Sequence, residues 1–333
     1  MGAYIKSISC YLPEKVLTNA MLVELFPEWS LDKIASKIGV TQRHIAAEGE
    51  TAGDMAAKAA EILFHDAAVE KSTVDFILFC TQSPDYFLPT TACLIQDKLG
   101  LRTGSGALDF NLGCSGYVYG LALAKGLVCS GIAKNVLLLT ADTYSKYIHP
   151  SDKSNRAIFG DAATATLISK EGFGEIGGFV FGTDGAGAEN LIVRSGASRN
   201  PSMNSEVLES LDPGGIQSTY LFMNGSAIFN FTLDSVPKLV AQVLAKNVLT
   251  HDEISLFLFH QANSFMLTTL RKVCKITEER FYIDMNDVGN TVSSTIPVAL
   301  SRLKDQNRLP QGNVLLSGFG VGYSWGGCIL TCR

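Results

Sequence analysis

One cysteine of this sequence has the surroundings of a nucleophile. Cys114 lies in LDFNLGCSGYVYG, where an apolar run typical of a strand gives way to one typical of a helix. The free N–H groups at a helix start stabilise a thiolate, and Gly113 and Gly116 let a ligand approach the backbone closely. The backbone N–H of Cys114 could also donate to an oxyanion at the attacked carbon. The alternative interpretation is a small, buried apolar residue.

Two further polar residues occur where other patterned segments end. His260 follows LFLF and precedes Gln-Ala-Asn, whereas the other four histidines lie in polar or helical surroundings. Asn290 lies in DVGNTVSS, a segment of turn-forming residues. The simpler interpretations are a structural histidine and an ordinary turn residue. If both face Cys114, two neutral donors beside a thiolate would suit acyl transfer or hydrolysis, and would stabilise an enolate or oxyanion without a metal.

The elements that must position these residues indicate an α/β fold. Near-continuous apolar runs predict buried strands at 74–80, 106–112, 135–141 and 163–169. Stretches with helical spacing and a terminal glycine lie between them, at 91–100 and 116–131. Apolar strands separated by helices indicate a sheet that is covered on both faces.

The second half of the chain repeats this order. EISLFLFHQAN (253–263) resembles VDFILFCTQSPD (74–85), and GNVLLSGFG (312–320) resembles KNVLLLTAD (134–142). Order and spacing agree as well as composition, which favours a duplication over chance similarity between Val/Leu-rich strands. We therefore predict two similar halves, 1–169 and 170–333.

A duplication would bring the candidate residues together. The loop with Cys114 corresponds to the loop with Asn290, and His260 ends an apolar run where Cys80 ends its counterpart. If the halves are related by a pseudo-twofold axis, these loops meet at the interface between the halves, where pockets usually form.

Composition excludes several classes of function. The 333 residues carry a net charge of −5 without a Lys/Arg run or basic-aromatic interleaving, so we expect no nucleic-acid partner. No apolar run approaches the roughly 20 residues of a membrane span, and the start is no signal peptide. The eight cysteines are scattered without a CxxC pair, which is typical of reduced thiols in a cytoplasmic protein. No ligand cluster, GxGxxG or Walker motif indicates a metal or a resident cofactor.

Motifs along the whole chain resemble the β-ketoacyl-acyl-carrier-protein synthase III family. They are GCSG (113–116), HQAN (260–263), GNT (289–291), GFGVGYSWG (318–326), IGVTQRHIA (38–46), GDAATA (160–165) and SPDYFLPTTACLIQDKLG (83–100). The resemblance implies the thiolase fold, in which two similar βαβαβαββ halves form a five-layered α-β-α-β-α arrangement. It also implies a homodimer.

The resemblance further implies a mechanism. Cys114 would take an acyl group from acyl-CoA or from the phosphopantetheine thioester of an acyl carrier protein. His260 and Asn290 would assist decarboxylation of malonyl-carrier protein by stabilising its enolate, which would then attack the acyl-cysteine. The tetrahedral oxyanion would lie between the backbone N–H groups of Cys114 and Val321. The activity would belong to fatty acid biosynthesis.

Expected substrate contacts are where the chain departs from the family. Lys33, Lys37 and Lys153 align with positions whose Trp and Arg residues hold the adenine and phosphate of coenzyme A, and lysine neither stacks on adenine nor binds phosphate in bidentate fashion. At two positions where the family has an arginine and a lysine that help to dock the carrier protein, this chain has Phe265 and Asn230. The remaining expected contacts, at the acyl pocket and in the HQAN motif, are Leu88, Phe229 and Asn263.

Two alternatives to a condensing enzyme stay open from the sequence. One is an acyltransferase of the same fold that passes the acyl group to an oxygen or nitrogen nucleophile. The other is a catalytically dead partner subunit, which would be expected to lack the cysteine. Retention of Cys114, His260 and Asn290 argues against the second alternative.

Overall fold

The fold was analysed in a computed structural model, which describes residues 2–30, 38–201 and 219–333. Lys33 and Lys37, two of the expected substrate contacts, lie outside the described residues. No disulfide joins any of the eight cysteines, all of which lie within the described ranges. The cytoplasmic location that we inferred from these cysteines stays a prediction.

The first half of the chain forms a five-stranded sheet. Its strands, in spatial order, are β5 (Gly106–Phe110), β4 (Phe76–Cys80), β6 (Val136–Asp142), β7 (Ala162–Ser169) and β1 (Tyr4–Tyr11). The pairs β5/β4 and β4/β6 are parallel, whereas β6/β7 and β7/β1 are antiparallel. All residues of β6 are buried, which is why VLLLTAD reads as a continuous apolar run rather than an alternating one.

The second half repeats this sheet with the same order and directions. Its strands are β12 (Phe281–Tyr282), β11 (Ile254–Phe259), β13 (Gly312–Gly320), β14 (Ser324–Cys332) and β8 (Gly174–Thr183). Parallel pairing again joins the first three strands, and antiparallel pairing joins the last three. A short β1/β8 contact, through Tyr4 with Glu175 and Ile5 with Gly174, links the two into one ten-stranded sheet.

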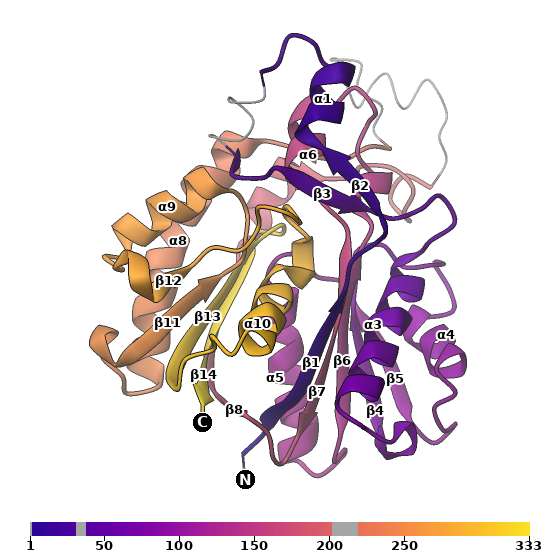
Figure 1. Ribbon diagram of the computed structural model, residues 1–333, viewed down its shortest axis with the longest axis vertical. Coiled ribbons are helices and arrows are strands. Elements are labelled where there is room, and N and C mark those ends of the chain that lie inside the picture. Colours follow the sequence, from indigo (N-terminus) through magenta and orange to yellow (C-terminus); the bar gives the residue numbers. More distant parts are fainter. Residues whose placement is uncertain (1, 31–37, 202–218) are drawn as a thin grey trace.

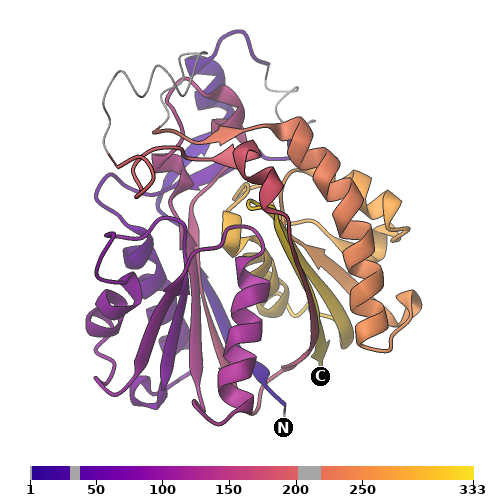
Figure 2. The same cartoon turned by 180° about the vertical axis from the view of Figure 1, so that it is seen from behind.

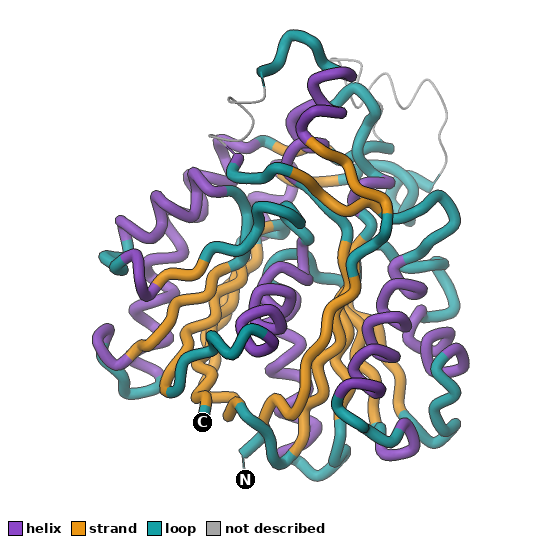
Figure 3. Tube along the Cα trace, in the orientation of Figure 1, coloured by secondary structure: helices purple, strands orange, loops and turns teal. Residues whose placement is uncertain are grey.

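Helices complete five layers, as the tubes and ribbons show (Figures 1, 2 and 3). On the outer face of the first sheet lie α3 (Ala52–Asp66) and α4 (Thr91–Lys98), and on that of the second lie α8 (Gly225–Lys246) and α9 (Ser264–Val273). Between the sheets lie α5 (Gly116–Cys129) and α10 (Thr295–Asp305). Each half therefore reads βαβαβαββ, and the fold is the thiolase fold that the sequence predicts. The domain boundary near residue 170 stays a proposal.

Close packing of the central layer explains its small residues. A Cβ at Gly120 of α5 would lie 2.6 Å from a methyl group of Leu138 in β6. The helix therefore approaches the strand more closely than a larger residue would allow. Because α5 contacts both sheets, its apolar residues extend around much of its circumference.

Several smaller elements lie at one end of the molecule, next to the loops that follow the carboxyl ends of the central strands (Figure 1). They are β2 (Lys15–Thr18), α1 (Asn19–Leu25), β3 (Gln42–Ile45), α6 (Lys153–Ile158), β9 (Leu191–Ile192) and β10 (Phe222–Met223). Within the described ranges, no helix is long and apolar enough to cross a membrane.

Candidate active site

Cys114 lies in a turn between β5 and α5 that only glycines allow. The cysteine is 6% exposed. A Cβ at Gly116 would meet the sulfur of Cys80 at 2.3 Å, and a Cβ at Gly320 would meet the Cys114 sulfur at 2.8 Å. Gly318 fits directly on the Cys114 backbone, since its Cβ would lie 2.8 Å from the Cys114 carbonyl oxygen. The GFGVG segment therefore lines the site with backbone, as its sequence indicates.

Two backbone N–H groups face the Cys114 sulfur. They belong to Cys114 itself and to Val321, and both favour the thiolate by hydrogen bonding. When an acyl group is attached to the sulfur, its carbonyl oxygen would lie within reach of the same two donors. Both residues expected at the oxyanion hole thus have a backbone N–H that bonds to the thiol sulfur, while their role as an oxyanion hole stays a prediction.

His260 comes directly after β11 and is held on three sides. Its backbone N–H donates to the Ser317 carbonyl at 2.8 Å, and its ring meets the edge of Phe319. Nδ1 lies 2.7 Å from the hydroxyl oxygen of Thr295. A neutral imidazole has one N–H, so a hydroxyl that donates to Nδ1 leaves that N–H on Nε2. His260 is 2% exposed, and burial lowers its pKa to about 3, so the ring is neutral at physiological pH.

Asn290 is fixed across the interface between the halves. Its backbone bonds to the first half, through its N–H to the Ile158 carbonyl at 2.9 Å and its carbonyl to the Gly160 N–H at 3.0 Å. The side-chain oxygen accepts from the Val292 N–H at 2.9 Å, which leaves Nδ2 pointing at His260 Nε2, 3.5 Å away. Gly289 adopts a φ of +71° at this turn, a conformation that favours glycine.

One cavity unites the three residues. Cys114, His260 and Asn290 all line a narrow space of about 120 Å³ between the two halves. The remaining lining is largely apolar and includes Phe159, Leu191, Met223, Ile228 and Met266. The convergence that the duplication predicts is therefore present in the structure. The catalytic roles of the three residues stay proposals.

The thiol is less acidic than its position before a helix predicts. Burial, together with the nearby Asp142 carboxylate, raises the pKa of Cys114 to about 12. The N–H groups of Val321 and Cys114 lower this pKa, but by less than burial raises it. The sequence argument considered the N–H groups that stabilise the thiolate. It did not include the burial of the sulfur, which removes water from the thiolate and raises its pKa.

Two residues of the site have no counterpart in the sequence analysis. Asp142 ends β6 and accepts from the Gln82 N–H at 2.8 Å and from the Ser293 hydroxyl at 2.5 Å, so it joins the loop after β4 to the segment that follows Asn290. Its pKa is raised to about 7, mainly by burial. Thr295 is the partner of His260. The position of the Asp142 carboxylate at the end of an apolar strand was a signal that could have identified it from the sequence. No comparable signal identified Thr295.

The remaining expected substrate contacts have mixed surroundings. Asn263 lines the cavity, and its side-chain oxygen caps α9 by accepting from the Met266 N–H at 2.9 Å. Phe229 stacks on Phe265, with ring centroids 5.4 Å apart.

Two others lie farther out. Lys153 pairs with Glu28 at 2.8 Å and lies over the Trp29 ring, 5.8 Å from its centroid. Leu88 is 83% exposed in the loop before α4.

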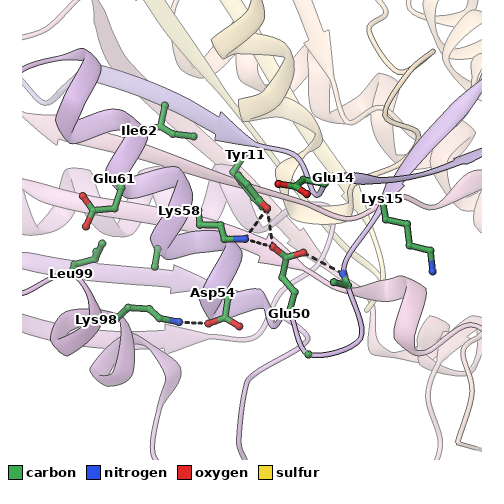
Figure 4. Close-up of a pocket in the computed structure, with 13 residues that line it drawn as sticks. Tyr11, Glu14, Lys15, Glu50, Asp54, Lys58, Glu61, Ile62, Lys98 and Leu99 are labelled. Atoms are coloured by element: carbon green, nitrogen blue, oxygen red, sulfur yellow. Dashed lines mark hydrogen bonds and ion pairs between the residues drawn. The ribbon is translucent and has the colours of Figure 1, made fainter.

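A larger hollow lies elsewhere, between β1, β2 and the outer helices α3 and α4 (Figure 4). Its volume is about 1190 Å³, but several of its charged groups are paired. The Lys58 ammonium lies 2.6 Å from Glu50 Oε1 and 2.9 Å from the Tyr11 hydroxyl, and Lys98 pairs with Asp54. No Cys, Ser, Thr or His is among its lining residues, so size alone does not locate the active site. Among the described residues, no group of three or more His, Cys, Asp or Glu could hold a metal ion.

Comparison with known proteins identifies the family. Residues 108–185 match the family model described as 3-oxoacyl-[acyl-carrier-protein (ACP)] synthase III, and residues 244–332 match the model of its C-terminal part. The β-ketoacyl-[acyl-carrier-protein] synthase III of Sulfurovum sp. (strain NBC37-1) is 35% identical over 98% of this chain and 95% of its own length. The chain therefore belongs to the β-ketoacyl-[acyl-carrier-protein] synthase III family.

Solved structures agree with this assignment. A crystal structure of a 3-oxoacyl-(acyl-carrier-protein) synthase III is 51% identical, with a TM-score of 0.95 over 99% of this chain and 100% of that chain. A 3-oxoacyl-(acyl-carrier protein) synthase from Burkholderia xenovorans LB400 is 39% identical, with a TM-score of 0.92 over 100% and 94%. Both the fold and the order of elements thus match those of condensing enzymes.

Proposed function

We propose that this chain is a condensing acyltransferase that makes a β-ketoacyl thioester from an acyl thioester and a malonyl thioester. The observation that carries the proposal is the cavity that Cys114, His260 and Asn290 line together. It combines a nucleophile with two neutral N–H donors, the set that acyl transfer followed by enolate chemistry needs. The family supports the same reaction class, since the named relatives are β-ketoacyl-[acyl-carrier-protein] synthases III.

In the first half-reaction, Cys114 receives the acyl group. Its sulfur attacks the carbonyl carbon of the donor thioester, the bond between this carbon and the donor sulfur breaks, and the thiol proton ends on the departing thiol. The N–H groups of Cys114 and Val321 hold the negative charge of the tetrahedral intermediate. This step needs neither His260 nor Asn290.

In the second half-reaction, His260 and Asn290 act on the malonyl thioester. Their N–H groups, on Nε2 and Nδ2, lie close enough to donate together to its carbonyl oxygen. Loss of carbon dioxide leaves an enolate with its charge on that oxygen, which these donors stabilise. The enolate carbon then attacks the acyl-cysteine carbonyl, a carbon–carbon bond forms, and Cys114 leaves as a thiolate that is reprotonated.

The shape of the cavity supports thioesters of a thin, flexible carrier arm as substrates. Its volume of about 120 Å³ and its apolar lining suit the phosphopantetheine chain of coenzyme A or an acyl carrier protein. We propose both as donors, without a resident cofactor or metal. Lys153 is the one described lysine of the three expected phosphate contacts, and its ion pair with Glu28 would have to open for that role.

A homodimer is also proposed. Tyr86, Phe87 and Leu88 are 62%, 86% and 83% exposed in the loop before α4. Strand β5, which α4 contacts, is an edge of the ten-stranded sheet and exposes Leu108. An uncovered edge with neighbouring apolar side chains is a surface that a second copy could cover. Sedimentation at the mass of a single chain would contradict this proposal.

Intact-protein mass spectrometry tests the function. After incubation with acyl-CoA and acyl-carrier-protein panels, we expect one acyl adduct on the Cys114 peptide, which is absent in Cys114→Ala. Addition of a malonyl thioester should then release carbon dioxide and a β-ketoacyl thioester. No adduct with any donor would contradict the enzymatic function. An adduct discharged to an alcohol or amine without carbon dioxide would instead support the acyltransferase alternative.

A further inference from the structure

A second cavity, of about 870 Å³, adjoins the active-site cavity, with which it shares Leu191. Val321 lines it, and the Val321 N–H is one of the two groups that bond the Cys114 sulfur. The carboxamide of Gln82, another lining residue, packs so closely on Gly113 that a Cβ there would meet its Oε1 at 2.5 Å. The second cavity therefore reaches the residues that pack directly around Cys114, and we take it as the space for the far part of an acyl group on the sulfur.

The wall of this cavity next to Gly113 is polar. The Tyr144 hydroxyl donates to Gln82 Oε1 at 2.5 Å, and Gln82 Nε2 donates to Asn111 Oδ1 at 3.0 Å. The Tyr147 hydroxyl donates to the Gln82 carbonyl at 3.4 Å. Tyr144 is 4% exposed, and its ring packs on Phe159, so its hydroxyl is held in place. A cavity that received only hydrocarbon would not need this network.

The wall retains hydrogen-bonding capacity for a ligand. A carboxamide nitrogen carries two N–H groups, and the contact with Asn111 uses one of those of Gln82. The phenol oxygen of Tyr144 keeps its lone pairs after it donates its proton. A hydroxyl group can accept from the first and donate to the second. A hydrocarbon chain would displace water from both and return no hydrogen bond.

From this geometry we propose that the acyl group accepted by Cys114 carries a hydroxyl, so that the donor is a hydroxyacyl thioester. Gln82 and Tyr144 are the specificity-determining residues, because a polar site discriminates against analogues that lack the matching polar atom. The inference rests on the proposed function, since it names the acyl group used at the same site.

Single-turnover acylation of the full-length protein tests the inference with matched donors. Butanoyl-CoA is compared with 3-hydroxybutanoyl-CoA and 4-hydroxybutanoyl-CoA, and the Cys114 adduct is followed by mass spectrometry. At least one hydroxylated donor should react about tenfold faster or more than butanoyl-CoA. Tyr144→Phe removes only the hydroxyl and should lower the ratio of the hydroxylated-donor rate to the butanoyl rate most of the way to one. Tyr119→Phe is the control, since Tyr119 lines neither cavity and bonds the Gly182 carbonyl.

The outcomes separate this inference from the function on which it rests. Equal rates for all three donors, with a normal adduct, overturn the hydroxyacyl preference and leave the condensing function intact. No adduct with any donor overturns both. Gln82→Met provides a second variant in case Tyr144→Phe fails to fold, which circular dichroism detects. A preference that survives both substitutions in folded protein also overturns the assignment.

Discussion

The two halves of the molecule place different chemistry at equivalent positions. Strand β4 ends at Cys80 and its equivalent β11 leads directly into His260, while the turn after β5 carries Cys114 and the turn after β12 leads to Asn290. The first half supplies a nucleophile, and the second supplies two neutral donors. A duplicated scaffold thus brings the turn after β5 and the loops after β11 and β12 to one cavity, where each supplies a different functional group.

Cys80 and Cys114 show how surroundings decide between structure and chemistry. The Cys80 thiol donates to the Leu112 carbonyl at 3.1 Å and lies where a Cβ at Gly116 would touch it. It lines neither the active-site cavity nor the second cavity that adjoins it. Cys114 opens onto the active-site cavity. The first thiol therefore fills space beneath the helix start, and the second can meet a substrate.

The largest expected effect separates the donors of the second half from the nucleophile of the first. His260→Ala and Asn290→Ala should each reduce carbon dioxide release from a malonyl thioester by about 10²- to 10³-fold, the loss expected for a preorganised donor. Both variants should still form the acyl adduct on Cys114. Radiolabelled malonyl thioester measures the first quantity, and mass spectrometry measures the second.

A different division of labour would appear in the same data. If His260→Ala abolished the acyl adduct, the histidine would serve the nucleophile as well as the enolate. Normal decarboxylation in both variants would contradict the roles assigned to the second half. Cys114→Ala provides the matched control, because it removes the acyl acceptor and leaves both donors in place.

The pH dependence of Cys114 reactivity tests the role assigned to the first half, which supplies the nucleophile. Its pKa is raised to about 12, so the thiolate is a minor species at neutral pH and its population rises tenfold per unit as the pH increases. Alkylation by iodoacetamide should therefore accelerate about a hundredfold from pH 7 to pH 9. A plateau below pH 8 would mean that the thiolate is already formed, which the sequence argument from the helix start favours.

Cys80 tests whether this reactivity belongs to one thiol. Burial raises its pKa well above the ordinary value, and it lines neither cavity at the site. Peptide mapping after alkylation at pH 8 should find the label on Cys114 before it finds any on Cys80. Cys80→Ala should leave the rate of labelling at Cys114 unchanged.

The sequence predicted the features of this fold that depend on local residue patterns. The apolar runs near β4, β6 and β7 were recognisable because these strands are buried almost throughout, and the repeated order revealed the second sheet. Strand β5 was also expected to be buried, but it is an edge strand whose residues are half-buried or exposed. Strand β1 and helix α3 were not predicted. The partners of β1 are β7 and β8, more than 150 residues away, so its place at the junction of the sheets depends on tertiary contacts.

The same distinction applies within the site. Cys114, His260 and Asn290 were identifiable because each follows a patterned segment. The hydrogen bond between Asp142 and Ser293 spans 151 positions, and nothing local announces it. The raised pKa of Cys114 has the same origin, since desolvation is produced by residues from both halves that close around the sulfur. Sequence located the functional groups, and packing set their protonation states.

The smallest expected effect concerns the tautomer of His260. A hydroxyl at position 295 can donate to Nδ1 and so keep the N–H of the neutral ring on Nε2, toward Asn290 and the substrate. Thr295→Val keeps the shape and removes this hydrogen bond, together with the longer contact of the same hydroxyl with the Val292 carbonyl at 3.3 Å. Because a single hydrogen bond contributes about 1 kcal/mol, we expect decarboxylation to slow about five- to tenfold while acylation of Cys114 is unchanged.

Thr295→Ser is the matched control, since it keeps the hydroxyl and removes only a methyl group. It should restore most of the decarboxylation rate that Thr295→Val loses. Equal losses in both variants would show that Thr295 acts through packing against its neighbours. Retention of the full rate by Thr295→Val would show that the ring keeps its Nε2–H without the hydroxyl, so that Asn290 and the fold of the β11 loop alone orient the donor pair.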